Sequence, residues 1–188
     1  HSNIPILGLI GHSEKLTSLI VPKNSKSIIS ESFRSIRTNL QYLAIDKTKK
    51  VITVTSSIGG EGKTFCSMNL ASIFALSGNK TIIIGADLRK PKLELEFKSE
   101  NKKGLSNYLI NKATLKEVTN KTGVDHLDII FSGPTPPNPA ELLDSAKMKD
   151  LIKELNKKYD YVIIDTPPIG LVTDGVILMK NADINLYV

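Results

Sequence analysis

Five short apolar runs, rich in β-branched residues, recur along the 188-residue chain with helix-like stretches between them. Runs of this length suit strands that are covered on both faces, and strands that alternate with helices form parallel sheets. The sequence therefore predicts an α/β fold, with a doubly wound, mainly parallel sheet and helices on both of its faces. The predicted strands are residues 51–55, 81–85, 127–131, 161–165 and 184–188.

Two of the intervening stretches carry clear helix signals. Residues 63–77 follow a glycine-rich turn and predict one helix. Residues 139–157 predict another, for which Asn138 is the candidate N-cap, Pro139 takes the first helical position and Glu141 can complete a capping box.

The first 50 residues predict a leader packed on the α/β core of residues 51–188, so that residues 1–188 make a single domain. Within the leader, residues 30–43 predict a helix. One stripe at helical spacing is apolar and is expected to face the core: Phe33, Ile36, Leu40 and Leu43. We interpret His1 and Ser2 as a remnant of cloning.

Charge and cysteine content exclude several kinds of protein. The net charge is +6, but the lysines are scattered rather than gathered into a run with aromatics, which indicates solvated faces and not a nucleic-acid surface. The single cysteine, Cys66, excludes an internal disulfide and is expected to be a small core residue in a reducing cytosol. Since no apolar run approaches the ~20 residues that span a bilayer, we expect this fragment to be soluble.

The stretch "TSSIGGEGKT" joins the strand at 51–55 to the helix at 63–77. A glycine-rich turn in this position directs backbone N–H groups at one point near the positive end of a helix dipole, which favours phosphate. Lys63 would reach the β- and γ-phosphates, and the Thr64 hydroxyl would bind Mg²⁺. The candidate nucleotide-binding residues are Ser57, Gly59, Gly60, Glu61, Gly62, Lys63, Thr64 and Phe65.

Two acidic residues follow other predicted strands. Asp87 lies just past the strand at 81–85, and Asp165 closes the strand at 161–165. Ligands of parallel α/β sheets bind beyond the carboxyl ends of the strands, so both carboxylates are expected beside the glycine-rich loop. Mg²⁺ on nucleotide phosphates takes one or two carboxylates, often through water. We therefore expect Thr64, Asp87 and Asp165 to hold the metal, and Lys63, Asp87 and Asp165 to be catalytic.

Four segments in this order and spacing, "SSIGGEGKT", "IIIGADLRKPK", "GPTPPNPAELL" and "YDYVIIDTPPIGLVTDG", resemble the cytoplasmic catalytic domain of bacterial tyrosine kinases. These are P-loop autokinases of capsule and exopolysaccharide export. The stretch "ESFRSIR" fits the E-x-x-R-x-x-R motif of the family at Glu31, Arg34 and Arg37. The family has Ser or Ala where Ser57 stands, which accounts for the absence of the usual first glycine of the loop.

The resemblance implies a P-loop NTPase-type fold and a protein-tyrosine autokinase that uses ATP and Mg²⁺. The acceptors would be tyrosines in the C-terminal tail of a neighbouring subunit, with Glu31, Arg34 and Arg37 in the contact that closes a ring-like homo-oligomer. It also implies a membrane-embedded polysaccharide co-polymerase or activator segment as partner, a cognate phosphotyrosine phosphatase, and no nucleic acid. The location implied is the cytoplasmic side of the bacterial inner membrane.

Two features depart from the family pattern. Gly85 stands where the family has the first Asp of a D-x-D motif, the candidate group to orient or deprotonate the acceptor, so Gly85→Asp is expected to raise activity. The final helix and tyrosine-rich tail do not follow Val188, and Tyr161 and Tyr187 are expected to be buried in strands. Gly85 favours an alternative, a nucleotide-switched assembly module with weak kinase activity. A partition-type P-loop ATPase is disfavoured by Ile58, where that class has a lysine.

Overall fold

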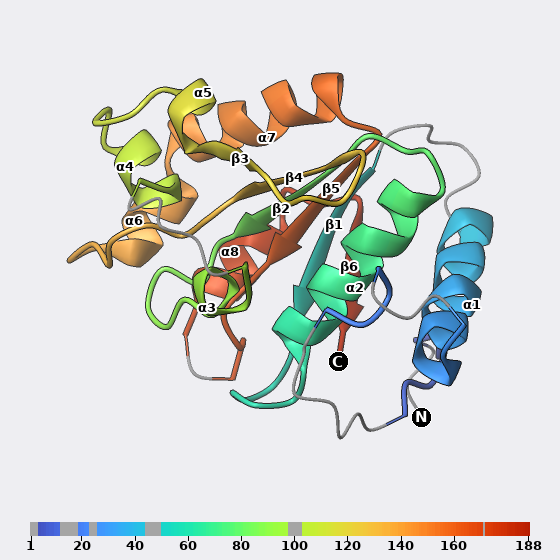
Figure 1. The fold of residues 1–188 in the computed structure, drawn as a ribbon. Coiled ribbons are helices and arrows are strands. Elements are labelled where there is room, and N and C mark those ends of the chain that lie inside the picture. The colour runs from blue at the N-terminus through green and yellow to red at the C-terminus, as the bar shows by residue number, and fades with distance from the viewer. Residues whose placement is uncertain (1–3, 12–18, 23–25, 44–49, 98–102, 171) are drawn as a thin grey trace.

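A parallel β-sheet forms the centre of the computed structural model (Figure 1), which describes residues 4–11, 19–22, 26–43, 50–97, 103–170 and 172–188. Within these residues the sheet has six strands in the order β3-β4-β2-β5-β1-β6, and each neighbouring pair is parallel except β3 and β4. The predicted fold class is confirmed. The strands are β1 Lys50–Thr55, β2 Thr81–Gly85, β3 Thr119–Lys121, β4 Leu127–Ile130, β5 Tyr161–Asp165 and β6 Ile184–Tyr187.

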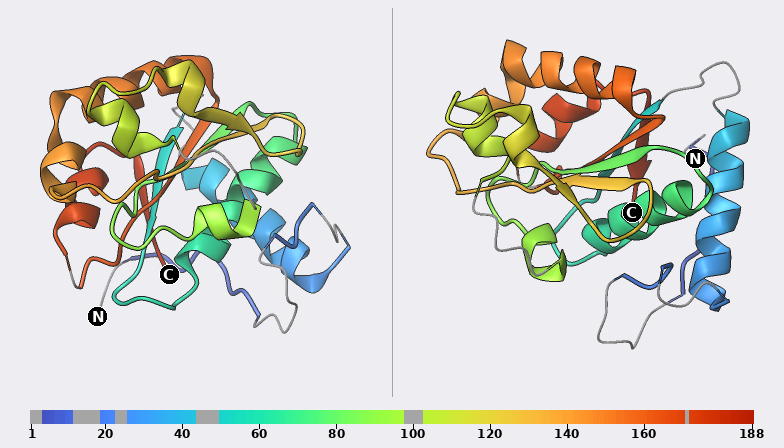
Figure 2. Two further views of the ribbon diagram at one scale, coloured as in Figure 1. Left: turned by 60° about the vertical axis from the view of Figure 1, so that its left-hand side comes forward. Right: turned by 45° about the horizontal axis from the view of Figure 1, so that its top comes forward.

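Helices cover both faces of the sheet. Figures 1 and 2 show α1 (Ile28–Leu43) and α2 (Lys63–Leu76) on one side, and α7 (Ala146–Lys158) and α8 (Asp174–Met179) on the other. Successive strand residues alternate between these two layers, as the two-residue period of a strand requires. Ile83 packs in the cluster with α1 and α2, while its neighbours Ile82 and Ile84 pack in the cluster with α7 and α8. Each face therefore has its own apolar core.

Four shorter helices lie on the left of Figure 1: α3 Leu93–Phe97, α4 Leu105–Leu109, α5 Leu115–Val118 and α6 Pro139–Asp144. The sequence patterns did not indicate α3, α4, α5, α8 or the edge strand β3. Each is six residues or shorter, which is too short for a window of hydrophobic periodicity to detect.

The helix predicted over residues 139–157 is two helices, and that prediction is wrong in its continuity. Ser145 is extended (φ −62°, ψ 153°), ends α6 and caps α7, where its hydroxyl accepts a hydrogen bond from the Met148 N–H (3.2 Å). The expected capping box is also not formed. The Asn138 amide instead donates to the Glu141 carboxylate (2.7 Å).

The α1 helix packs on α2 through most of the predicted stripe. Phe33, Ile36 and Leu40 are buried, as predicted. Leu43, the last residue of α1, is 58% exposed, so its predicted burial is wrong. The end of α1 lies beyond the apolar surface of α2 that Phe33, Ile36 and Leu40 cover.

A second part of the leader is attached to α2 by a side chain. The N–H groups of Ile20 and Val21, two fully buried residues, donate to Asn69 Oδ1 at 2.9 and 3.0 Å. A buried backbone donor is costly to leave unpaired, so Asn69 fixes the path of this segment. His1 and Ser2, which we interpret as a remnant of cloning, lie outside the described residues.

Candidate functional site

The glycine-rich loop joins β1 to α2 in the predicted position. Gly60 and Gly62 have φ values of 95° and 103°, a region that L side chains rarely adopt. Gly62 is the N-cap residue of α2, so the following N–H groups open toward the loop. The Glu61 carboxylate accepts a hydrogen bond from the Ile58 N–H (2.9 Å) and so braces the loop from within.

A hollow of about 180 Å³ opens beside this loop. It is lined by loop and α2 residues together with two charged residues at α3: Gly60, Gly62, Lys63, Thr64, Phe65, Met68, Lys92 and Glu96. A larger hollow of about 460 Å³, between Tyr108 and Lys147, contains none of the predicted site residues. We place the site at the smaller hollow because the phosphate-binding backbone and the lysine are there.

Asp165 is tied directly to the start of α2. Its Oδ2 accepts a hydrogen bond from the Thr64 hydroxyl and its Oδ1 accepts one from the Ser67 hydroxyl, each at 2.9 Å. Burial raises the pKa of Asp165 to about 6, and these hydrogen bonds and the Lys63 charge limit the rise. The predicted convergence of Thr64, Lys63 and Asp165 is thus present in the structure. Ser67 is a further member that sequence analysis missed.

The segment after β5 runs along the opening turn of the loop. The Ile169 and Gly170 N–H groups donate to the carbonyls of Ser56 (2.9 Å) and Ser57 (3.0 Å). A Cβ on Gly170 would lie 2.5 Å from the Ser57 carbonyl oxygen, so this close approach requires glycine. The Ser57 hydroxyl also bonds the hydroxyl of Tyr187 on β6. Tyr187 is 59% exposed, so its predicted burial is wrong, whereas Tyr161 is buried as expected.

Asp87 lies at the same edge of the sheet, in the turn after β2. Its Oδ1 accepts hydrogen bonds from the N–H groups of Arg89 (3.2 Å) and Lys90 (2.9 Å), which fixes the turn. The negative charge of Asp87 contributes to raising the pKa of Asp165. The two carboxylates are therefore close enough to interact, as expected for residues that both lie at the carboxyl edge of the sheet.

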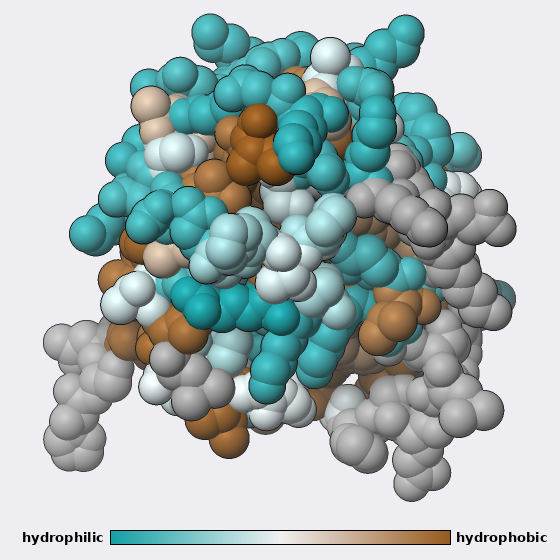
Figure 3. All heavy atoms as spheres, turned by 90° about the vertical axis from the view of Figure 1, so that its left-hand side faces the viewer, coloured by the Kyte–Doolittle hydropathy of each residue, from teal (hydrophilic) through white to brown (hydrophobic). Residues whose placement is uncertain are grey.

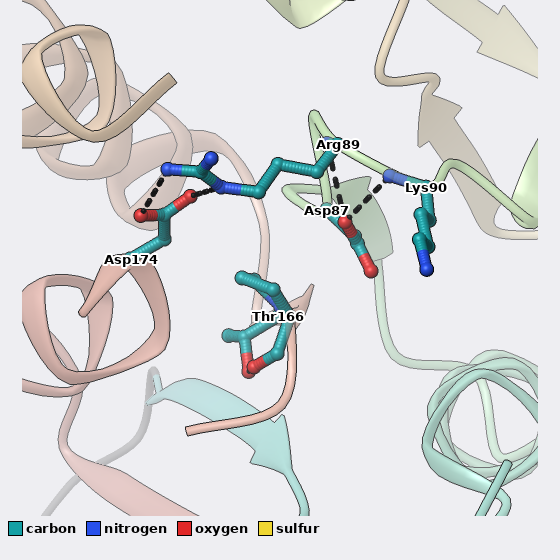
Figure 4. A network of polar contacts seen from close by, with 6 residues as sticks. Asp87, Arg89, Lys90, Thr166 and Asp174 are labelled. Atoms are coloured by element: carbon teal, nitrogen blue, oxygen red, sulfur yellow. Dashed lines mark hydrogen bonds and ion pairs between the residues drawn. The ribbon is translucent and has the colours of Figure 1, made fainter. Parts of the chain in front are cut away.

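Arg89 connects this turn to α8 through a bidentate ion pair with Asp174 (Figure 4). The distances are 2.8 Å for Nε–Oδ2 and 3.1 Å for Nη2–Oδ1, and the Asp174 side chain is only 1% exposed. Asp174 raises the pKa of Arg89 chiefly through these hydrogen bonds. Neither residue stands out in the sequence, because their pairing depends on a contact across the fold and leaves no local pattern.

The space beside Gly85 is already filled. A Cβ at this position would lie 2.8 Å from Ser132 Oγ, 3.2 Å from the Ser132 backbone nitrogen and 3.2 Å from Leu93 Cδ1. The expectation that Gly85→Asp alone raises activity therefore meets a steric obstacle. Ser132 has to give way before an acidic side chain fits there.

Glu31, Arg34 and Arg37 lie on α1, away from the loop of their own chain. Arg34 pairs with Glu31 (2.6 Å), and Arg37 donates to the hydroxyl of Ser77. Ser77 ends α2 at the opposite end from Lys63. Within one chain, the structure does not bring this motif to the nucleotide site.

Cys66 follows Thr64 on α2 and packs partly buried against the core. Burial, with a smaller contribution from the charge of Asp165, raises the pKa of its thiol to about 11. The thiol is therefore protonated at neutral pH, in keeping with a packing role and not with a nucleophile.

The oxygen donors at the carboxyl edge suit Mg²⁺. The Thr64 hydroxyl and the carboxylates of Asp87 and Asp165 are hard ligands of the kind that Mg²⁺ takes alongside phosphate and water. Within the described ranges there is no group of three or more His, Cys, Asp or Glu side chains that could hold a metal. No helix in the described part of the chain has the length and apolar character needed to cross a membrane.

Comparisons with known proteins agree on one family. The profile described as "AAA domain" matches residues 49–185. The tyrosine-protein kinase YwqD of Bacillus subtilis is 44% identical over 166 residues, which cover 88% of this chain and 70% of YwqD. The solved structure of the chimerical protein CapA2B2 has a TM-score of 0.91 at 41% identity, over 97% of this chain and 79% of that one. The kinase domain of the Escherichia coli tyrosine kinase ETK has a TM-score of 0.87 at 34% identity, over 95% and 70%.

Proposed function

The chain belongs to the bacterial tyrosine-protein kinases, and on this premise we propose that it transfers the γ-phosphoryl group of Mg-ATP to tail tyrosines of a neighbouring subunit. The observation that carries the proposal is the junction of Asp165 with Thr64 and Ser67 beside Lys63. A lysine, a hydroxyl and a carboxylate at a glycine-rich loop are the parts that phosphoryl transfer requires.

Each group has a distinct task in this proposal. The loop N–H groups and the Lys63 ammonium bind the phosphates and offset charge as the γ-phosphoryl leaves ADP. Asp165 is held by Thr64 and Ser67, and Asp87 is held in its turn by two backbone N–H groups. These two carboxylates would hold the metal. Bound Mg²⁺ would neutralise charge on the β- and γ-phosphates. Catalysis then consists mainly of positioning and charge stabilisation.

The biological setting proposed for the chain rests on the family resemblance. The kinase would regulate capsular or exopolysaccharide polymerisation and export at the cytoplasmic side of the inner membrane. Its partners would be further copies of itself in a ring, a membrane-embedded co-polymerase or activator segment, and a phosphotyrosine phosphatase. The side that carries α3, α4 and α6 is largely hydrophilic, with apolar side chains in small separate groups (Figure 3), which suits an acceptor peptide that binds and leaves.

A second function is favoured by Gly85. Since this position has no side chain and Ser132 fills the space, the protein could act as a nucleotide-switched assembly module with weak kinase activity. The two functions differ in one measurable quantity, the rate of phosphotyrosine formation at saturating Mg-ATP.

Lys63→Met tests the proposed function. Mg-ATP at about 100 times its Kd should stabilise the wild-type chain by about 3 kcal/mol, which is a melting shift of about 5–10 °C. The variant should keep the unliganded melting temperature but lose most of this shift, together with phosphotyrosine formation on a glutamate–tyrosine copolymer.

Lys80→Met is the matched control, because Lys80 is exposed just ahead of β2. An equal nucleotide shift in wild type and Lys63→Met would refute the role of Lys63. A normal shift without phosphotyrosine formation in the wild type would instead support the assembly module.

A further inference from the structure

The Glu94 carboxylate is held at the carboxyl end of β4 by two successive backbone amides. Its Oε1 accepts hydrogen bonds from the N–H groups of Ser132 (2.8 Å) and Gly133 (3.3 Å). Its Oε2 is shielded from solvent and receives no hydrogen bond from the described residues. A shielded carboxylate oxygen without a donor is costly, so its presence calls for an explanation, and a catalytic role is one.

These amides face the end of β2. On the other side of this segment, N–H groups of α4 bond the carbonyls of Phe131 (2.7 Å) and Ser132 (3.0 Å). The Ser132 nitrogen, which Glu94 contacts, is 3.2 Å from the point where a Cβ on Gly85 would lie. The Glu94 carboxylate thus contacts the Ser132 amide, and this amide lies against the point where a side chain at position 85 would begin. Glu94 belongs to α3, the helix that follows β2. It therefore supplies a carboxylate near Gly85, where β2 itself has no side chain.

The three aspartates at this edge are already in use. Asp165 accepts from two hydroxyls with its two oxygens, and Asp174 accepts from Arg89 with both of its own. Asp87 holds its turn and is assigned to the metal. Glu94 is left with an oxygen that can accept one more hydrogen bond. The phenolic hydroxyl of a tyrosine is a donor of the required kind.

From this arrangement we infer that Glu94 is the general base for the acceptor tyrosine, an inference that rests on the kinase function proposed above. The tyrosine O–H proton passes to Glu94 Oε2, directly or through one water, and the phenolic oxygen forms a bond to the γ-phosphorus. The bond from that phosphorus to the β–γ bridging oxygen breaks, and ADP leaves with the electron pair. Oε2 is shielded in the unliganded chain, but Glu94 as a whole is only partly buried, so the acceptor hydroxyl reaches Oε2 when the Glu94 side chain turns toward its exposed side.

The same arrangement accounts for Gly85. An acidic side chain there would collide with Ser132, and its charge would lie beside the Glu94 carboxylate. Two carboxylates in one small space disfavour each other. The site therefore carries one acid at this point, contributed by α3 in place of β2.

Glu94→Gln separates the charge of this residue from its structural contacts. The Gln carbonyl can still accept from the Ser132 and Gly133 amides, but it cannot take a proton. With Mg-ATP and a glutamate–tyrosine copolymer, kcat should fall by about 10²–10⁴-fold, while KM for ATP and the melting shift with ATP stay unchanged. Glu154→Gln, at a partly exposed residue of α7 that pairs with Lys158, is the matched control and should change neither.

A rescue makes the test specific. In the Glu94→Gln background, Ser132→Gly removes the hydroxyl nearest to position 85, and Gly85→Asp then restores an acid there. This triple variant should regain at least about tenfold in kcat, whereas Ser132→Gly alone should regain nothing.

Three results overturn the inference in distinguishable ways. An active wild type with an equally active Glu94→Gln removes Glu94 from the reaction and leaves the kinase function intact. A loss of kcat accompanied by an equal loss of the melting shift makes Glu94 a structural brace. A wild type that binds ATP but transfers no phosphate overturns the kinase function and the role of Glu94 together.

Discussion

Asp165 is a buried carboxylate. Its raised pKa means that its ionisation lowers the free energy of unfolding. Burial lifts the pKa from the ordinary 3.8 to about 6, so the folded state binds the proton more tightly than the unfolded chain. The free energy of unfolding therefore decreases as pH rises from about 4 to about 6, and the loss persists above that range. In the unliganded protein, this carboxylate is retained at the expense of stability.

Asp165→Asn should raise the stability of the unliganded protein at pH 7.5, by up to about 3 kcal/mol for a pKa shift of about two units. Asparagine can still pair with the hydroxyls of Thr64 and Ser67. The gain should shrink toward pH 4, where the wild-type residue is protonated in the folded state and partly protonated in the unfolded state, and Mg-ATP should no longer stabilise the variant as it does the wild type. Thermal melts from pH 4 to 8 measure this. A variant less stable than wild type at pH 7.5 would contradict the account.

At the scale of elements, the Arg89–Asp174 pair joins the turn after β2 to the beginning of α8. The Asp87 carboxylate is held by backbone N–H groups of that same turn. The position of a predicted metal ligand thus depends on an ion pair formed with a helix from a distant part of the sequence. Such a pair supports the site without touching the nucleotide.

Arg89→Met leaves the buried Asp174 carboxylate without its cation. We expect a loss of about 2–3 kcal/mol, or about 5–10 °C in melting temperature, together with a higher Mg²⁺ requirement for stabilisation by ATP. Lys90→Met, in the same turn, is the control, because Asp87 bonds the backbone of Lys90. Adding Asp174→Asn to Arg89→Met should recover part of the stability but not the Mg²⁺ response. If Arg89→Met melted like the wild type, the pair would not brace the turn.

At the scale of the whole molecule, α1 lies on the outside of the α2 layer, where its charged stripe can meet another subunit (Figure 1). Trans-phosphorylation requires a head-to-tail contact that closes into a ring. Arg34 and Arg37 already have partners within the chain, Glu31 and Ser77, so an interface would have to exchange or extend these contacts.

Replacing both Arg34 and Arg37 with alanine should convert any oligomer to monomer in light scattering, because a planar guanidinium pairs well with carboxylates across an interface. The control with the same loss of charge is Lys153→Ala with Lys157→Ala on α7. Unchanged mass in the arginine variant at matched concentration would show that the interface lies elsewhere.

The parts of the fold that could be predicted have signals contained in a few consecutive residues. The strands of the parallel sheet are short, mainly apolar runs, and the loop before α2 has its glycines and lysine within ten residues. The carboxyl-edge rule then placed Asp165 correctly beside Thr64. The local sequence pattern and the carboxyl-edge rule together were sufficient to predict this part of the site.

The remainder depends on contacts that local pattern does not encode. Residues 139–157 look continuous because every residue there tolerates a helix, and the break is a single extended residue, Ser145. Tyr187 is exposed because β6 pairs with one strand, β1, among the described residues. The Arg89–Asp174 pair and the amides that hold Glu94 connect elements far apart in sequence. Only the assembled fold brings these groups together.

The pairing of β1 with β5 also determines when the protein becomes able to function. These two strands align from Lys50 with Tyr161 to Val54 with Asp165, although most of the chain lies between them. Contacts of such long sequence separation carry a loop-closure entropy and form slowly. During synthesis, the phosphate loop leaves the ribosome long before its acidic partner. A nascent chain therefore holds half of a catalytic centre until β5 inserts between β2 and β1 and brings Asp165 to the loop.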